Sequence, residues 1–300
     1  MRKPMNQTSF QELDQISGKL RMYGRVITAG KRGLSEDDYL PRLGVSIHKQ
    51  QADIAKAGDY AKVCGFEVDS SALPMSFPHV MSFGLQMELM LLPEFPLPLL
   101  GIVHLGNRIR NYRKILPQES LDITVELVGD RLVEKGREMD LEAKVYASGQ
   151  LVWEGLSTYL SRCKVKHVKA KAKKLPVFAE FENKLEWKLA DDLGRQYAAA
   201  SGDSNPIHLY PWTAKLLGFK RHIAHGMWSK ARIIAELLPK LEGDAAEVTV
   251  EFKLPIFLPG KVVLHSNQVT AKGCNFELRN DKNDKIHVVG SIKPLVSVAH

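Results

Sequence analysis

The chain has 300 residues, of which 44% are apolar and 25% are charged, a composition typical of globular proteins rather than disordered or fibrous ones. Its richest apolar stretch, residues 87–105, is interrupted by Glu94 and three prolines. No segment therefore has the run of apolar residues that a membrane span needs. Residues 1–30 are polar and of mixed charge, without the apolar core of a signal peptide. These features predict a protein that is neither secreted nor embedded in a membrane.

The net charge comes almost entirely from one short segment. The 42 basic residues exceed the 34 acidic ones, which gives a formal net charge of +8. Seven of the basic side chains fall within residues 162–174, where there is no acidic residue, so the rest of the chain is nearly neutral. We expect this basic strip to be a solvated linker, or else a contact for phosphates or an acidic partner. Nucleic acid is not expected as a partner, because no nucleic-acid-binding motif accompanies the strip.

The spacing of the cysteines and the absence of several common motifs argue against further classes of protein. Cys64, Cys163 and Cys274 lie far apart, and no two of them have CxxC spacing. This argues against a disulfide framework or a cysteine zinc site, and it is typical of a reducing compartment such as the cytoplasm. The chain also lacks a glycine-rich phosphate loop, an HExxH motif and a GxSxG motif. The sequence therefore lacks the motifs of the commonest nucleotide-binding proteins, zinc proteases and serine hydrolases.

An internal repeat organises the chain. The motif Tyr60-Ala-Lys-Val-Cys-Gly65 recurs as Tyr197-Ala-Ala-Ala-Ser-Gly202, and each copy ends a short helical pattern. An apolar helix is predicted after each copy, over residues 81–92 and 226–238, and His79 and His222 are interpreted as equivalent residues that precede it. Turn residues then separate a series of strand-like segments, which lie at residues 101–110, 115–125, 139–147 and 151–161 in the first half and at 247–254, 257–264, 276–279 and 286–292 in the second.

This order of elements predicts the architecture. A long apolar helix wrapped by an antiparallel sheet buries its apolar stripe without a second layer of helices. The sequence therefore predicts an α+β fold in which one such unit is used twice. We divide the chain into an N-terminal extension, a first unit, a basic linker and a second unit, at residues 1–39, 40–161, 162–180 and 181–300.

The second unit differs from the first by an extra polar segment, Asp203-Ser-Asn-Pro-Ile-His208, directly after the shared glycine. Gly202 and Pro206 restrict the backbone to a tight path that can direct Asp203, Asn205 and His208 into one small volume. A carboxylate beside an imidazole is a general acid–base pair that can orient and activate water. The alternative is a helix-ending loop in which the Asp and Asn side chains only bond the amides of a turn.

The residues that follow favour the catalytic interpretation. Gly226 stands at the N-terminus of the second apolar helix, where its bare N–H, aided by the helix dipole, can approach a developing oxyanion. An acid–base pair with such a donor forms a complete site for enolate-type chemistry. We expect His225 to shape the loop, and His79 and His222 to have structural roles at the entry of each helix.

The second half resembles a known family. The motif Tyr197-Ala-x-x-Ser-Gly-Asp-x-Asn-Pro-Ile-His208, followed by Gly218-Phe219, Ile223-Ala-His-Gly-Met227 and Phe252-Lys-Leu-Pro255, is similar to the MaoC-type (R)-specific enoyl-CoA hydratases and dehydratases. The fold of that family is the hot dog, a long helix wrapped in an antiparallel sheet. The first half looks like a degenerate hot dog, so the whole chain resembles the double-hot-dog members, in which two tandem hot-dog folds form a pseudo-dimer.

The resemblance implies specific roles for the residues. Asp203 and His208 would be the catalytic dyad, Asn205 would support it, and Gly226 would supply an oxyanion-hole N–H. The implied reaction of fatty-acid metabolism is the reversible hydration of a trans-2-enoyl thioester to the (R)-3-hydroxyacyl thioester. Such a hydro-lyase uses no cofactor and no metal.

Other points stay open at this level. The acyl group would arrive on CoA or on an acyl carrier protein, and the protein would act as a monomer or a homodimer. Two other functions are not excluded by the motifs alone, a noncatalytic module that binds acyl thioesters or acyl carriers, and a hot-dog thioesterase.

Overall fold

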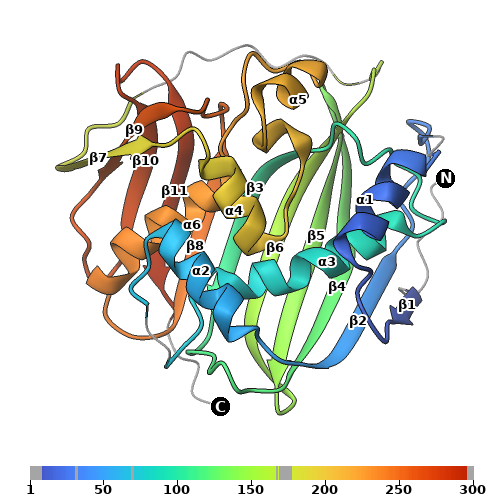
Figure 1. The fold of residues 1–300 in the computed structure, drawn as a ribbon, viewed down its shortest axis with the longest axis horizontal. Coiled ribbons are helices and arrows are strands. Elements are labelled where there is room, and N and C mark those ends of the chain that lie inside the picture. The colour runs from blue at the N-terminus through green and yellow to red at the C-terminus, as the bar shows by residue number, and fades with distance from the viewer. Residues whose placement is uncertain (1–8, 31–32, 69–70, 167, 169–177, 296–300) are drawn as a thin grey trace.

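A computed structural model describes residues 9–30, 33–68, 71–166, 168 and 178–295. Their strands form one continuous sheet that curves around a set of helices (Figure 1). The strands are β1 (Ser9–Glu12), β2 (Leu43–Gln50), β3 (Val103–Asn111), β4 (Leu121–Val133), β5 (Gly136–Ala147), β6 (Gln150–Arg162), β7 (Asn183–Leu189), β8 (Ala246–Phe252), β9 (Gly260–Ser266), β10 (Cys274–Asn280) and β11 (Ile286–Pro294). The helices are α1 (Lys19–Thr28), α2 (Ile54–Cys64), α3 (Phe77–Leu91), α4 (Leu193–Ser201), α5 (Pro211–Leu216) and α6 (Gly226–Leu237). Short 3-10 turns lie at Pro206–His208 and Leu238–Lys240.

The strand order repeats in reverse about the centre of the sheet. It runs β1-β2-β4-β5-β6-β3-β8-β11-β10-β9-β7, so β2 to β3 in the first half mirror β7 to β8 in the second. The pairs are antiparallel, except that β1 joins the edge of β2 in parallel. The chain thus has the predicted α+β fold, with one helix-and-sheet unit used twice.

Three strands had no counterpart in the sequence prediction, namely β1 in the N-terminal extension and the first strand of each half. Each half begins with a strand, β2 or β7, ahead of its first helix. Five of the seven residues of β7 are exposed, so its sequence shows little of the alternation that marks a half-buried strand. These strands pair with β4 and β9 and complete five antiparallel strands in each half.

The predicted match between His79 and His222 is wrong. α3 begins at Phe77, so His79 lies inside its first turn. The helix can include Pro78, because a proline is tolerated in the first turn, where N–H groups have no intrahelical partner. His222 lies outside α6, in the segment before it. The first residue of α3, Phe77, therefore corresponds to the first residue of α6, Gly226. The connection into α6 is about twice as long as the connection into α3.

The two halves meet where β3 pairs with β8, from Gly106 opposite Glu251 to Asn111 opposite Ala246. Lys230 of α6 is fully buried against this junction. Its Nζ donates hydrogen bonds to the backbone oxygen of Asn107 at 3.1 Å, to Asn107 Oδ1 at 2.6 Å and to the backbone oxygen of Val248 at 2.8 Å. One side chain of the second half thereby binds both strands of the junction.

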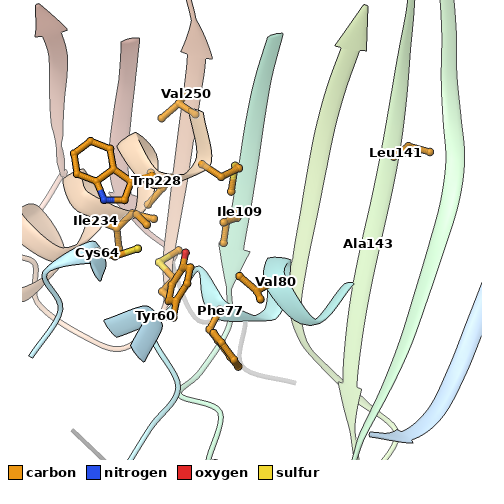
Figure 2. Close-up of a cluster of buried hydrophobic side chains, with 14 of the residues drawn as sticks. Tyr60, Cys64, Phe77, Val80, Ile109, Leu141, Ala143, Trp228, Ile234 and Val250 are labelled. Carbon is orange, nitrogen blue, oxygen red and sulfur yellow. The ribbon is translucent and has the colours of Figure 1, made fainter. Parts of the chain in front are cut away.

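The halves also share one apolar core. Figure 2 shows side chains from both halves in the same cluster, among them Tyr60, Cys64, Phe77, Val80, Ile109, Trp228, Ile234 and Val250. The indole N–H of Trp228 donates to the backbone oxygen of Val63 at 2.9 Å, which joins α6 to α2. The packing that holds the second unit in shape is therefore partly supplied by the first.

The segments outside the two units are described in part. The N-terminal extension contributes β1 and α1, and α1 lies against α3 (Figure 1). Of the basic strip, residues 167 and 169–174 lie outside the described residues, so its assignment as a linker stays a prediction. Among the described helices, none combines the length and the apolar character that crossing a bilayer requires.

The buried His79 makes folding sensitive to acid. Burial, with a smaller contribution from the charge of Lys230, lowers the pKa of His79 to about 3. The unfolded chain would bind a proton below pH 6.5 while the folded chain does not, so the free energy of unfolding falls as the pH falls through this range. The loss from this group is at most about 1.4 kcal/mol per pH unit.

We therefore expect His79→Phe to flatten the dependence of stability on pH between about 6 and 4. Urea unfolding of both proteins across this range measures the free energy of unfolding at each pH. A packing defect in the variant would lower this free energy at every pH without changing its slope against pH. Parallel curves for the two proteins would contradict the assignment of His79 as a buried neutral group.

Candidate active site

The segment after α4 is a chain of tight turns. Gly202 ends the helix with φ of +86°, a left-handed conformation that glycine adopts without strain. Asp203 Oδ1 accepts the N–H of Asn205 at 3.1 Å, and Asn205 Oδ1 accepts the N–H of Ile207 at 3.4 Å. Both side chains thus bond turn amides, as the alternative interpretation requires. The same bonds hold the carboxylate of Asp203 in place and start the 3-10 turn that ends at His208.

The ring of His208 has a defined tautomer. His208 is buried, and its Nδ1 lies 2.7 Å from the backbone oxygen of Ile223. A carbonyl oxygen only accepts, so Nδ1 carries the hydrogen and Nε2 of the neutral ring carries the lone pair. Burial lowers the pKa of His208 below its usual 6.5, although the nearby charge of Asp203 opposes the shift. At neutral pH the ring is therefore uncharged, with Nε2 available as a base.

A glycine of α4 allows this turn to pack closely. A Cβ added at Gly194 would lie 1.9 Å from the backbone oxygen of His208, so only glycine fits there. The sequence motif gave no indication of this role, since Gly194 looks like an ordinary helical residue in a short helix.

His225 contacts both predicted dyad residues. Its ring stacks on that of His208, with centroids 3.7 Å apart, and its Nε2 lies 3.1 Å from the backbone oxygen of Asp203. Burial and the neighbouring His208 lower the pKa of His225 well below its usual value, so two uncharged rings stack without repulsion. His225 thus fixes both the backbone of the loop and the plane of the His208 ring.

One ligand atom each from Asp203, His208 and His225 lies within 4.8 Å of the others. A water molecule can bridge two such atoms with hydrogen bonds of about 2.8 Å each. The same spacing would suit a metal ion. His225 Nε2 carries the hydrogen that it donates to the Asp203 carbonyl, so the lone pair of that ring is on Nδ1.

Gly226 follows His225 as the first residue of α6. The first N–H groups of a helix have no partner within the helix, so its N–H can serve another acceptor. A Cβ at Gly226 would lie 3.0 to 3.1 Å from ring atoms of Phe252, so the glycine also lets β8 pack closely against the helix start. Gly226 therefore lies beside the His225–His208 stack.

Two further residues complete the surroundings. His222 Nε2 lies 2.7 Å from the backbone oxygen of Asp191, a contact that ties the segment before α6 to the start of α4. Tyr23 of α1 reaches the loop from far away in the sequence, and its hydroxyl accepts the N–H of Ser204 at 2.6 Å. No signal in the sequence could connect α1 to this segment.

Comparisons with known proteins indicate what the chain is similar to. Residues 176–290 match the family described as MaoC like domain. The chain is 29% identical over 264 residues to 3-hydroxyacyl-thioester dehydratase X of Mycobacterium tuberculosis, covering 86% of this chain and 91% of that protein. It is 37% identical over 89 residues to the (R)-specific enoyl-CoA hydratase of Aeromonas caviae, covering 29% of this chain and 61% of that enzyme.

Solved structures extend the likeness to the whole fold. The crystal structure of HtdX from Mycobacterium tuberculosis has a TM-score of 0.74 at 28% identity and covers 83% of this chain and 99% of that chain. The tandem hot-dog prediction is thereby confirmed, with both units in one continuous sheet. Residues 176–290 thus match the MaoC like domain family, and the chain as a whole is similar to a dehydratase with the same two-unit fold.

Proposed function

We propose that this protein catalyses the reversible hydration of trans-2-enoyl thioesters to (R)-3-hydroxyacyl thioesters in fatty-acid metabolism. The relatives named above are hydro-lyases that act on acyl thioesters, and this chain has the same class of activity. The observation that carries the finer proposal is the neutral His208, which lies in one cluster with Asp203 and keeps the lone pair on Nε2 because Nδ1 donates to Ile223. An uncharged imidazole beside a carboxylate is suited to take a proton from water.

In the proposed mechanism, the thioester carbonyl accepts a hydrogen bond from the N–H of Gly226. A water molecule bridges Asp203 and His208 and attacks C3 of the enoyl group as His208 Nε2 takes one of its protons. Electron density moves from the double bond toward the thioester oxygen, where the Gly226 N–H and the dipole of α6 stabilise the developing charge. The proton then goes to C2, so that one water is added across the double bond. Asn205 acts indirectly, by holding the turn that presents His208.

The first half is not proposed to hold a second site. Phe77 stands at the start of α3 where Gly226 stands at the start of α6. Its ring is buried against Tyr60, with centroids 5.5 Å apart, so side chains fill the position where a thioester would meet the helix. The first unit thus supports the catalytic unit rather than duplicating it.

The substrate and setting follow the same proposal. An acyl-CoA or acyl-carrier-protein thioester is the expected partner, and a cytoplasmic location agrees with Cys64, Cys163 and Cys274 being free thiols. A thioesterase built on the same fold would release free CoA from the substrate, whereas a binding module would leave it unchanged.

Crotonyl-CoA tests these three functions together. We expect the wild-type protein to remove the enoyl absorbance without releasing free thiol, and chiral analysis to find the (R)-3-hydroxy product. Asp203→Asn and His208→Ala should each lower kcat by about 10²- to 10⁴-fold with little change in the melting temperature. Because both groups act on one water, the double variant should be scarcely slower than either single one. Near-wild-type turnover in either single variant would remove that residue from the dyad.

A proline substitution tests the oxyanion donor directly. Gly226→Pro deletes the N–H at the first helical position, where proline is best tolerated, and His225 already has the extended backbone that a following proline requires, with ψ of 137°. Gly226→Ala is the matched control, because it keeps the N–H but adds the same Cβ against Phe252. We expect kcat of the proline variant to fall about 10²- to 10³-fold below that of the alanine variant. Equal turnover in the two variants would place the donor elsewhere.

A further inference from the structure

We propose that Tyr23 of α1 is a positioning residue of the active site, which holds the Asp203 carboxylate and the loop behind it in the geometry for catalysis. This inference rests on the proposed function, and it adds to it a residue from outside the region that matches the family, residues 176–290. The sequence motif places the whole site in the second half of the chain. With Tyr23, the site would also depend on the N-terminal extension.

The contact has the chemistry of a bridge. The Tyr23 hydroxyl accepts the N–H of Ser204 at 2.6 Å, so its own hydrogen is left to donate. The geometry assigns that hydrogen to the carboxylate of the neighbouring Asp203, which interacts with the phenol. One hydroxyl therefore binds both the backbone and the side chain of adjacent residues in the catalytic loop. Burial, together with the negative charge of Asp203, raises the pKa of Tyr23, so the phenol stays protonated and remains a donor at any pH at which the enzyme would work.

The helix that carries Tyr23 is anchored to the first unit. Glu88 of α3 binds Arg25 Nη1 in the last turn of α1 at 2.6 Å and the backbone N–H of Ser17, just before the helix, at 3.0 Å. The Glu88 side chain is only 9% exposed, which strengthens a hydrogen-bonded ion pair relative to one at the surface. The chain just before α1 packs closely as well, since a Cβ at Gly84 would lie 2.6 Å from the Ile16 side chain. Tyr23 is thus presented by a docked helix rather than a loose tail.

The arrangement explains how the carboxylate is oriented. Asp203 follows a helix end, and its carboxylate is tied locally only to the N–H of Asn205. His225 binds the backbone oxygen of Asp203, and the Tyr23 hydroxyl accepts the N–H of the next residue, Ser204. A donor to a carboxylate favours its ionised form and fixes its orientation, which are the two properties that a water-orienting group needs.

Tyr23→Phe tests this role by removing the hydroxyl and keeping the ring. We expect kcat on crotonyl-CoA to fall about 10- to 100-fold, the effect of losing one charge-assisted hydrogen bond, while KM changes little. Tyr146→Phe is the matched control, since Tyr146 lies on the face of β5 opposite its buried residues, away from the core.

A second measurement reads the contact itself without using activity. Hydrogen exchange of the Ser204 amide should speed up in Tyr23→Phe and stay unchanged in Tyr146→Phe. In an Asp203→Asn background, Tyr23→Phe should cause little further loss of kcat, because the carboxylate it positions is already gone.

The outcomes separate this inference from the proposed function. If the wild-type protein hydrates crotonyl-CoA and Asp203→Asn is inactive, but Tyr23→Phe keeps the wild-type kcat, the positioning role is overturned and the proposed function stands. Faster exchange at Ser204 with unchanged kcat would likewise overturn it, leaving a contact without a catalytic effect. A wild-type protein without hydratase activity would overturn the proposed function and this inference together.

Discussion

The pairing of β3 with β8 is the interaction on which the rest of the structure depends. It joins two five-stranded units into one sheet, and Lys230 locks the junction by binding carbonyl oxygens on both strands. An ammonium group buried in this way is costly unless its hydrogen bonds are made, so the three acceptors around Lys230 fix where α6 lies relative to the junction. The start of α6 carries Gly226, and the position of the proposed oxyanion donor follows from this contact.

The junction also brings the first half to the edge of the site. Phe252, at the end of β8, packs against Gly226 and meets the ring of His104 from β3, with centroids 5.2 Å apart. His104 in turn stacks on Tyr159 of β6 at 4.5 Å. A row of aromatic side chains thus runs from the first unit to the start of α6. The first unit therefore contributes to the packing around the start of α6.

The features that could be predicted from the sequence are those encoded locally. Asp203 and His208 lie five positions apart, directly after Gly202 and with Pro206 between them, so their meeting depends on turn chemistry that short motifs report well. The helices α3 and α6 and most strands follow from apolar periodicity. The match between His79 and His222 failed because Pro78 was interpreted as preceding a helix that in fact includes it. β7 was missed because most of its residues are exposed.

The rest depends on tertiary contacts that have no local signature. Gly194 is required only because the backbone of His208 packs against it, and the sequence of α4 does not indicate that contact. Tyr23 reaches Ser204 across most of the chain, through a helix docked on α3 by Glu88. Such positions become visible only when the fold places distant segments together, and here they surround a motif that the sequence alone could identify.

The most direct measurement of the central claim is a crystal structure of the Asp203→Asn variant with a trans-2-enoyl thioester bound. The account predicts the thioester oxygen within about 3 Å of the Gly226 nitrogen, and C3 of the acyl chain facing His208 Nε2. A thioester bound in the first half beside Phe77, or one whose carbonyl points away from the start of α6, would contradict it.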